Sequence, residues 1–206
     1  MKNLDLSLYL VTDKSDNVEK FLKTIEEAIK GGTTVVQIRE KTAETFDFYN
    51  LALKVKEITK KYNVPLIIND RVDVALAVDA DGVHVGQSDM PCDVTRKLIG
   101  ENKILGVSAA TIEEAKKAQK DGADYIGTGA VFPTQTKDDT PKITKNDLKE
   151  IVESIDIPVV AIGGITLENA HELTDTGIAG LSVVSAIMSS NNPKKSSQEL
   201  LNIFNS

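Results

Sequence analysis

The chain has 206 residues, of which 41% are hydrophobic and 27% are charged, which is ordinary for a soluble globular protein with one sizeable core. Its formal net charge of −7 argues against general attraction to nucleic acid or to an anionic membrane, so an anionic ligand would need local cations or a metal. No run approaches the roughly 20 apolar residues of a membrane-spanning helix, and the first residues do not resemble a secretory signal.

Cysteine usage points to the cytoplasm. The single cysteine, Cys92, cannot form a disulfide within the chain, so we expect a reducing compartment and a fold held by its core. Cys92 follows a proline in a predicted loop with no histidine nearby in sequence, which indicates an ordinary free thiol. Small molecules are the expected partners, and the sequence does not decide whether the chain forms a homo-oligomer.

Short apolar, β-branched runs alternate with longer amphipathic runs along the whole chain. The first strand is expected at 8–11, and a helix follows at about 18–30, capped by Asn17 and ended by Gly31-Gly32. Further strands are expected at 35–38, 66–68, 82–85, 104–107, 125–127, 159–162 and 181–184. Further helices are expected at 46–61, 72–78, 94–99, 112–120, 145–154, 168–176 and 197–204.

Eight strand-then-helix units in succession favour a closed, parallel (β/α)8 barrel, the TIM barrel, as a single domain over residues 1–206. Continuous apolar strands suit a parallel sheet that is buried on both faces. An open dinucleotide-binding sheet would instead carry a glycine-rich turn after the first strand. That turn here reads Thr12-Asp13-Lys14-Ser15 and contains no glycine.

Polar side chains collect where the predicted strands end, whereas glycine and proline dominate where the strands begin. Active sites of this barrel lie at the carboxyl ends of its strands, so the asymmetry indicates an enzyme. The segments concerned are Gln37–Lys41, Asn69–Arg71, His84–Asp89, Ser108, Pro133–Lys137, Gly163-Gly164 and Ser185.

The end of the second strand carries a candidate anion receptor. Gln37, Arg39 and Lys41 lie two residues apart, so an extended strand would project them to one side, into the barrel mouth. An arginine grips phosphate through two hydrogen bonds, and a lysine adds a mobile charge. The alternative is a solvated charge run at the end of a strand, and Arg39 could also simply pair with Asp70 or Glu40.

Asp70 and Asp89 follow neighbouring strands and form a candidate metal site. Adjacent strand ends stand about 5 Å apart, and two such carboxylates repel one another unless they are protonated or bridged by a cation. Hard oxygen ligands without a cysteine or histidine cluster favour Mg²⁺. The alternative for each aspartate is a helix cap or a turn residue.

Two further segments are candidates for binding phosphate. Gly163-Gly164 after the seventh strand and Ser185 after the eighth lie where such barrels often hold a phosphate, although a tight turn explains the glycines equally well. The longest predicted connection, Gly129 to Lys142, is either a binding loop or a flexible polar loop. Of the two histidines, His84 is expected to be a hydrogen-bonded core residue and His171 a surface residue.

Eight motifs fall in order along the strands and their ends. They are Gln37–Lys41, Ile68–Arg71, Gly82–Asp89, Gly106–Ser108, Gly122–Gly127, Val131–Thr134, Ile162–Ile165 and Val183–Ser185. Together they resemble the thiamine phosphate synthase family over essentially the whole chain. The resemblance implies a cytoplasmic transferase of thiamine biosynthesis that uses Mg²⁺ to join hydroxymethylpyrimidine diphosphate to a thiazole phosphate and releases pyrophosphate.

The resemblance also implies roles for individual residues. The pyrimidine diphosphate would be held by Gln37, Arg39, Lys41, Asn69, Ser108 and Lys137, among which Arg39, Lys41, Ser108 and Lys137 would take part in catalysis. The thiazole phosphate would be held by Thr134, Thr136, Gly164, Val184 and Ser185, and Mg²⁺ by Asp70 and Asp89. Ile38, Glu40 and Gln135 lie within the same segments and are expected to contact substrate.

The mechanism implied by the resemblance begins with early loss of pyrophosphate, which leaves a methylene cation on the aminopyrimidine. The thiazole nitrogen then attacks this carbon, so no protein nucleophile is needed. Ala110, Ala130 and Gln135 depart from residues frequent in the family. The sequence does not decide whether the thiazole substrate carries a carboxyl group.

Two rival functions are open. A thiazole tautomerase with a similar barrel would need no Mg²⁺–pyrophosphate site and would use an acid–base residue, often a histidine, which Ala110 and Ala130 do not supply. A non-catalytic barrel that binds a phosphorylated ligand would be expected to lose the metal or cation groups. The sequence keeps both groups, which favours the synthase.

Overall fold

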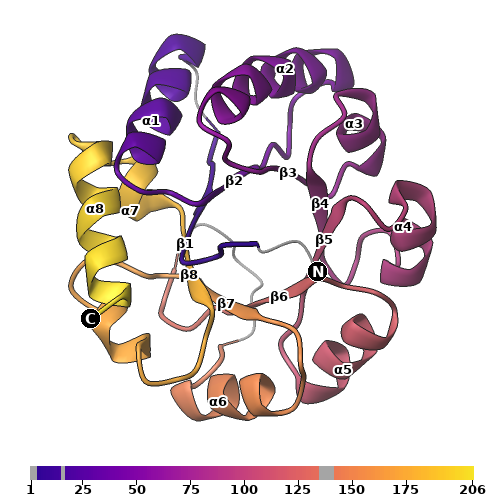
Figure 1. Ribbon diagram of the computed structural model, residues 1–206, viewed down its shortest axis with the longest axis vertical. Coiled ribbons are helices and arrows are strands. Elements are labelled where there is room, and N and C mark those ends of the chain that lie inside the picture. Colours follow the sequence, from indigo (N-terminus) through magenta and orange to yellow (C-terminus); the bar gives the residue numbers. More distant parts are fainter. Residues whose placement is uncertain (1–3, 15–16, 135–141) are drawn as a thin grey trace.

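The computed structural model describes residues 4–14, 17–134 and 142–206. Parallel strands close into a barrel in chain order, and β8 pairs with β1 (Figure 1). The strands are β1 (Leu8–Val11), β2 (Val35–Ile38), β3 (Leu66–Asn69), β4 (Gly82–Val85), β5 (Ile104–Ser108), β6 (Tyr125–Thr128), β7 (Val159–Ile162) and β8 (Gly180–Val183). The predicted (β/α)8 barrel is confirmed, and each expected strand boundary agrees to within one residue.

Helices surround the barrel on its outside (Figure 1). They are α1 (Val18–Lys30), α2 (Thr45–Lys61), α3 (Val72–Ala77), α4 (Cys92–Ile99), α5 (Ile112–Lys120), α6 (Lys145–Glu153), the short 3-10 helix η1 (Ala170–Leu173), α7 (Ser185–Met188) and α8 (Pro193–Phe204). Several begin with a side-chain cap, as where Asn17 Oδ1 accepts a hydrogen bond from Lys20 N at 2.9 Å at the start of α1.

The helix expected at 168–176 is wrong, because only η1 forms there. Asn169 bonds to the neighbouring backbone instead: its Oδ1 accepts from Thr166 N at 2.8 Å and its Nδ2 donates to Gly164 O at 2.9 Å. Thr176 Oγ1 likewise donates to Leu173 O at 2.6 Å. Such local side-chain bonds compete with a regular helix.

The last two helices also differ from expectation. The four-residue helix α7 was not expected, since it is too short to show an amphipathic period. Helix α8 begins at Pro193 rather than at about 197. Asn192 Oδ1 accepts a hydrogen bond from Lys195 N at 3.1 Å, and proline suits the first turn of a helix because its missing N–H needs no partner there.

The strands are buried on both faces, apart from the half-buried last residues of β5 and β7, as expected for a parallel sheet. Alternate residues pack either against the surrounding helices or inside the barrel. The buried hydrophobic residues of the interior cluster are Leu6, Tyr9, Val11, Val35, Ile67, Ile104, Tyr125 and Val160. The interior of the barrel is therefore a filled core.

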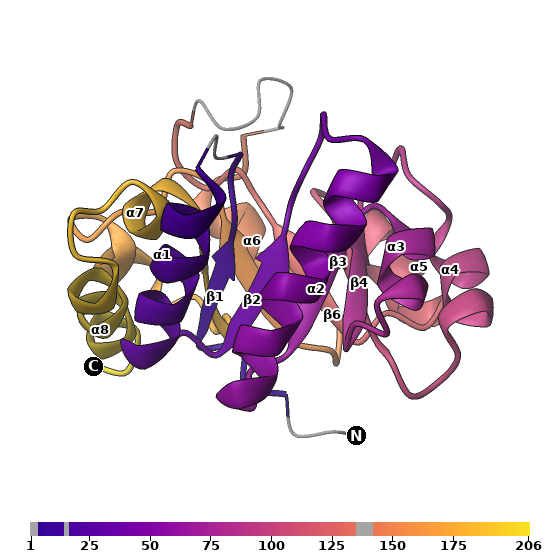
Figure 2. The ribbon, with the colours of Figure 1, turned by 90° about the horizontal axis from the view of Figure 1, so that it is seen from above.

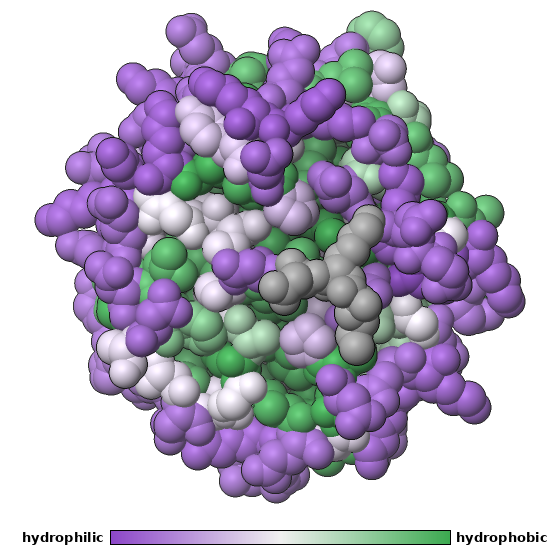
Figure 3. Space-filling model, viewed as in Figure 1, coloured by the Kyte–Doolittle hydropathy of each residue, from purple (hydrophilic) through white to green (hydrophobic). Residues whose placement is uncertain are grey.

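The carboxyl ends of the strands point toward the upper edge of Figure 2, and the amino ends of the strands lie toward the opposite edge. Figure 3 views that amino-terminal end, where apolar side chains gather near the middle and hydrophilic ones surround them. Within the described ranges, no helix combines the length and the apolar character needed to cross a membrane.

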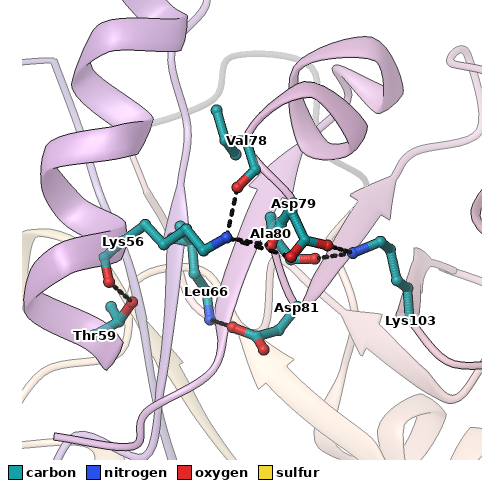
Figure 4. A network of polar contacts seen from close by, with 8 residues as sticks. All are labelled: Lys56, Thr59, Leu66, Val78, Asp79, Ala80, Asp81 and Lys103. Carbon is teal, nitrogen blue, oxygen red and sulfur yellow. Dashed lines mark hydrogen bonds and ion pairs between the residues drawn. The ribbon is translucent and has the colours of Figure 1, made fainter. Parts of the chain in front are cut away.

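A polar network ties together the segments that lead into β3, β4 and β5 (Figure 4). Lys56 Nζ on α2 donates to the carbonyl oxygen of Asp79 at 2.8 Å, and Lys103 Nζ pairs with Asp79 Oδ1 at 2.6 Å. Asp81 Oδ2 accepts a hydrogen bond from Leu66 N at 2.9 Å. These bonds hold the amino ends of neighbouring strands in register, away from the mouth.

Arg96 forms a second brace at the amino end. Its side chain is 10% exposed and donates to the backbone oxygens of Gly122, Gly100 and Lys103 at 2.7–3.0 Å. It also pairs with Asp124 Oδ2 at 2.6 Å. One guanidinium thus joins α4 to the turns before β5 and β6.

We predict that Arg96→Met lowers the free energy of unfolding by about 2–4 kcal/mol, because it leaves several carbonyl groups and Asp124 without their partner. Urea unfolding followed by circular dichroism measures the change. Lys97→Met is the matched control, since Lys97 is 75% exposed and pairs only with Asp93 on the same helix among the described residues. Equal unfolding midpoints for the two variants would contradict the role of Arg96.

Cys92 is the first residue of α4 rather than part of a loop, as the sequence had suggested. It is buried, and burial raises the pKa of its thiol to about 11. We predict that at pH 8 a disulfide reagent modifies the native protein at least about 100-fold more slowly than the urea-unfolded chain, because the thiolate is the reactive form. Absorbance of the released thiol measures both rates, and equal rates would show that Cys92 is accessible.

Candidate active site

A cavity of about 440 Å³ opens at the carboxyl ends of the strands. Its lining comes from all eight strands or the loops that follow them. The sequence-predicted site residues that line it are Gln37, Arg39, Lys41, Asn69, Asp70, Asp89, Ser108, Thr134, Gly164, Val184 and Ser185. The structure therefore brings together residues that lie as far apart in sequence as 37 and 185.

The other predicted site residues do not line this cavity or cannot be placed. Ile38 is fully buried in the core between strands and helices. Glu40 Oε1 accepts a hydrogen bond from Thr42 N at 3.0 Å and so stabilises the turn after β2. Gln135, Thr136 and Lys137 lie outside the described residues, and their roles stay predictions.

The candidate anion receptor lies at the cavity, at the end of β2. Gln37, Arg39 and Lys41 all line the cavity, as their two-residue spacing predicted. Arg39 N donates to Thr12 Oγ1 at 3.1 Å, which fixes the backbone just beyond β2. Among the residues that the structure describes, Arg39 forms no ion pair, whereas the Lys41 ammonium pairs with Asp70. The alternative in which Asp70 or Glu40 neutralises Arg39 is therefore wrong.

Asp70 is placed over the mouth by its backbone. Successive residues of a strand point to opposite sides, yet Asn69 and Asp70 both line the cavity. Asp70 has a φ of 62°, a left-handed conformation that aspartate tolerates better than most residues and that turns the chain where β3 ends. The N-cap of α3 is Arg71, without a side-chain cap bond, so the Asp70 carboxylate does not serve as a helix cap.

The two predicted metal ligands interact with each other. Burial raises the pKa of the Asp70 carboxyl; the hydrogen bond from Lys41 opposes this shift, and the nearby Asp89 carboxyl adds to it. Asp89 Oδ2 accepts a hydrogen bond from Gly86 N at 2.8 Å, so one of its oxygens closes the turn after β4. Lys41 provides part of the positive charge that this acidic pair requires.

The donor chemistry of this pair fits Mg²⁺. No group of three or more histidine, cysteine, aspartate or glutamate residues suited to a metal occurs in residues 4–14, 17–134 and 142–206. Mg²⁺ is commonly held by one or two carboxylates, with water and substrate phosphates completing its octahedron. Asp70 and Asp89 supply that number of carboxylates beside the cationic groups of the mouth.

The opposite side of the mouth is shaped by two glycines with positive φ, 99° at Gly163 and 68° at Gly164. A Cβ on Gly164 would lie 2.5 Å from Pro133 O, and one on Gly163 would lie 2.5 Å from Ala130 Cβ. The glycines thus let the loop after β6 pack against the end of β7. Ser185 begins α7 beside them, and the first N–H groups of a helix have no partner within it.

Hydrogen-bonded residues inside the barrel form the floor of the cavity. His84 Nδ1 and Nε2 lie 2.9 Å from Tyr125 Oη and from Ser108 Oγ, which confirms His84 as a hydrogen-bonded buried residue. Tyr9 and Tyr125 also line the cavity and were missed, because each stands in an apolar strand run and looks like core. Counting inward alternation in register with Gln37 and Ser108 would have found them.

A second hollow lies outside the barrel between α2 and α3. Its lining is Thr45, Phe46, Tyr49, Asp73, Val74 and Ala77. It contains one charged residue, whereas the mouth gathers cations, carboxylates and hydroxyls from many strands. The mouth of the barrel is therefore the candidate active site.

Comparison with known proteins identifies the family of the chain. Residues 8–187 match the family model described as thiamine monophosphate synthase. The chain is 72% identical over 204 residues to a thiamine-phosphate synthase of Methanobrevibacter smithii, covering 99% of this chain and 98% of the relative. It is 58% identical to one of Alkaliphilus oremlandii, covering 96% and 95%. The solved thiamine phosphate pyrophosphorylase from Pyrococcus furiosus superposes with a TM-score of 0.88 at 42% identity, covering 98% and 96%. The chain belongs to the thiamine monophosphate synthase family.

Proposed function

We propose that this chain makes thiamine phosphate by joining hydroxymethylpyrimidine diphosphate to a thiazole phosphate, with release of pyrophosphate. Family membership gives the reaction, and one observation ties it to the site. The Asp70–Asp89 pair lines the same cavity as the Arg39 guanidinium, which forms no ion pair within the described part of the chain, and this suits a diphosphate and its metal ion. The reaction takes place between small molecules, and we assign it to the cytoplasm.

The proposed reaction exchanges one bond for another at the methylene carbon of the pyrimidine. The C–O bond to the diphosphate breaks, and its electron pair leaves with the pyrophosphate. The electron-rich aminopyrimidine stabilises the methylene cation that remains. The lone pair of the thiazole nitrogen then forms the new C–N bond, so the positive charge ends on the thiazolium ring and no protein nucleophile is required.

The diphosphate is assigned to the side of the mouth that β2 and β3 build. Arg39 and Lys41 stabilise the charge that develops on the leaving oxygen, and fixed donors of this kind act without reorganisation at the moment of reaction. Asn69 and Ser108 contribute uncharged hydrogen-bonding groups from β3 and β5. Lys137 lies outside the described residues and is proposed as a third cation for the same group.

Asp70 and Asp89 are proposed to hold Mg²⁺ at this group. The bound ion would supply positive charge to the pyrophosphate oxygens as the C–O bond breaks. Lys41 pairs with Asp70, so its ammonium is available to the phosphate once Asp70 is bound to another cation.

The thiazole phosphate is assigned to the opposite side. Thr134, Gly164, Val184 and Ser185 line the mouth there, and (β/α)8 barrels frequently bind phosphate between the loops after strands seven and eight and a short extra helix. Gln135 and Thr136 are proposed to contribute from the adjoining loop. Anchoring the phosphate holds the ring nitrogen beside the reacting carbon, and such proximity supplies about 7–11 kcal/mol in the best intramolecular models.

The tautomerase alternative receives no support from the residues at its expected acid–base positions. Ala110 and Ala130 both line the cavity and offer no proton donor or acceptor in their side chains. A non-catalytic phosphate-binding barrel is likewise disfavoured, because the cations and the carboxylate pair are both present at the mouth.

We predict that purified protein given both substrates and Mg²⁺ releases pyrophosphate and forms thiamine phosphate in equal amounts. Chelating the metal with EDTA should stop the release, and added Mg²⁺ should restore it, because the leaving pyrophosphate needs the ion's charge. Coupled pyrophosphate detection and chromatography of the product measure the two yields. Absence of product with either the carboxylated or the plain thiazole phosphate would refute the assignment.

The metal site is tested by Asp89→Asn, which keeps an oxygen to accept the Gly86 N–H but removes the negative charge. We expect kcat to fall on the order of 100-fold, with little change in the affinity for the thiazole phosphate, because only the metal side is altered. Steady-state kinetics and calorimetric titration measure the two effects.

Asp93→Asn is the control, since Asp93 lies on α4 and pairs with Lys97 at the surface. It should retain the activity of the unmodified protein. An Asp89→Asn protein as active as this control would remove Asp89 from the metal site.

A further inference from the structure

A continuous line of hydrogen bonds crosses the interior of the barrel below the cavity. Gln37 Nε2 donates to Tyr9 Oη at 2.7 Å, and Tyr9 Oη lies 2.6 Å from Tyr125 Oη. Tyr125 Oη lies 2.9 Å from His84 Nδ1, and His84 Nε2 lies 2.9 Å from Ser108 Oγ. We call these five residues the Gln37–Ser108 relay; they come from β2, β1, β6, β4 and β5.

The relay is enclosed. Tyr9, Tyr125 and His84 are 1%, 0% and 8% exposed, so water cannot readily replace the bonds between them. Burial is also the main reason that the pKa of each tyrosine lies above its ordinary value, so both phenols keep their protons. Each hydroxyl therefore has one proton to donate and must find an acceptor inside the barrel.

The barrel wall leaves room for the relay. A Cβ on Gly106 would lie 2.2 Å from Tyr125 Oη and 2.5 Å from His84 Nδ1. A Cβ on Gly127 would lie 3.1 Å from His84 Cε1. Two inward strand positions thus lack a side chain where the imidazole and the phenol meet.

The proton directions in the relay follow from its first member. An amide nitrogen is only a donor, so Tyr9 Oη accepts from Gln37. The Tyr9 proton still needs an acceptor, and Tyr125 Oη at 2.6 Å is the oxygen that can take it. Tyr125 in turn donates to His84 Nδ1. The imidazole then accepts at Nδ1 and carries its proton on Nε2, which donates to Ser108 Oγ. In this arrangement every buried hydroxyl both accepts and donates.

We propose that Tyr9, Tyr125 and His84 are positioning residues that set the hydrogen-bonding character of Gln37 and Ser108 toward the substrate. The Gln37 amide nitrogen is held by the relay, so its carbonyl oxygen faces the cavity as an acceptor. Ser108 Oγ already accepts from His84, so its hydroxyl proton is the one offered to a ligand. An aminopyrimidine has an amino group to donate and ring nitrogens to accept, which matches these two ends; the inference rests on the proposed function.

The first test reads the tautomer of His84 directly, without any substrate. The chain has two histidines, so ¹⁵N-histidine labelling in His171→Gln protein leaves the signals of His84 alone. We expect a protonated, pyrrole-like Nε2 and an unprotonated, pyridine-like Nδ1. A proton on Nδ1 would reverse the direction and overturn the proposal.

The second test is a double-mutant cycle on kcat/KM for the pyrimidine diphosphate. Tyr125→Phe should lower kcat/KM about tenfold, as expected for losing one buried hydrogen bond that matters in the reaction. In a Ser108→Ala background the same change should lower kcat/KM by less than about twofold, because the serine hydroxyl that the relay orients is then absent. Tyr9→Phe provides a second route to the result if Tyr125→Phe does not fold.

The matched control is Tyr62→Phe, which removes a phenol that donates to Glu26 Oε1 at 2.8 Å between outer helices. It should leave kcat/KM unchanged in both backgrounds. Additive effects of Tyr125→Phe and Ser108→Ala on kcat/KM, together with an unchanged His84 tautomer in Tyr125→Phe, would contradict the proposal. The tyrosines would then serve only to pack the core. An inactive wild-type protein would reject the proposed function, while the ¹⁵N measurement would still decide the relay.

Discussion

Closure of eight parallel strands in register is the constraint on which the site depends. It sends every strand's carboxyl end to one rim and lets alternate residues point inward, so the side chains of Gln37, Asn69 and Ser108 meet although 71 positions separate the first from the last. A slip of one residue in a single strand would exchange its inward and outward side chains and empty that sector of the mouth. The braces at the amino end, through Asp79 and Arg96, therefore protect the geometry of a site that they do not touch.

Charge is distributed unevenly over the two ends of the barrel. At the amino end, Arg96 is satisfied by backbone oxygens and a carboxylate, and Asp79 is satisfied by lysines. At the mouth, Arg39 has no ion-pair partner among the described residues, and Asp70 shares its surroundings with a second carboxylate. The paired charges at the amino end stabilise the fold. The charges at the mouth can instead be neutralised by ligands: a diphosphate can pair with the guanidinium, and a metal ion can pair with the two carboxylates.

The barrel and its strands were predictable from the sequence, because parallel strands that are buried on both faces appear as short, continuous apolar runs such as Leu66–Ile68. The helix expected at 168–176 failed because Asn169 and Thr176 bond to the local backbone, a competition that apolar spacing does not register. The pairing of Asp70 with Lys41 rather than with Arg39 was also not predictable, since it depends on the left-handed turn at Asp70. Tyr9 was overlooked for a different reason. A tyrosine in an apolar run looks like a core residue, and the partners of its hydroxyl can be identified only once the register of the strands is known.

The interior polarity of the barrel follows from the same register. Inside the barrel, Tyr9 and Tyr125 belong to one buried cluster with Val35, Ile67 and Ile104, where a hydroxyl finds few partners. The two phenols bond to each other, and they also bond to Gln37 and His84. A buried polar layer of this kind costs little only when every member is satisfied. The two ends of the relay are the Gln37 carbonyl and the Ser108 hydroxyl, at the floor of the mouth. The hydrogen bonds that satisfy the buried phenols therefore also present a defined acceptor and a defined donor to the substrate.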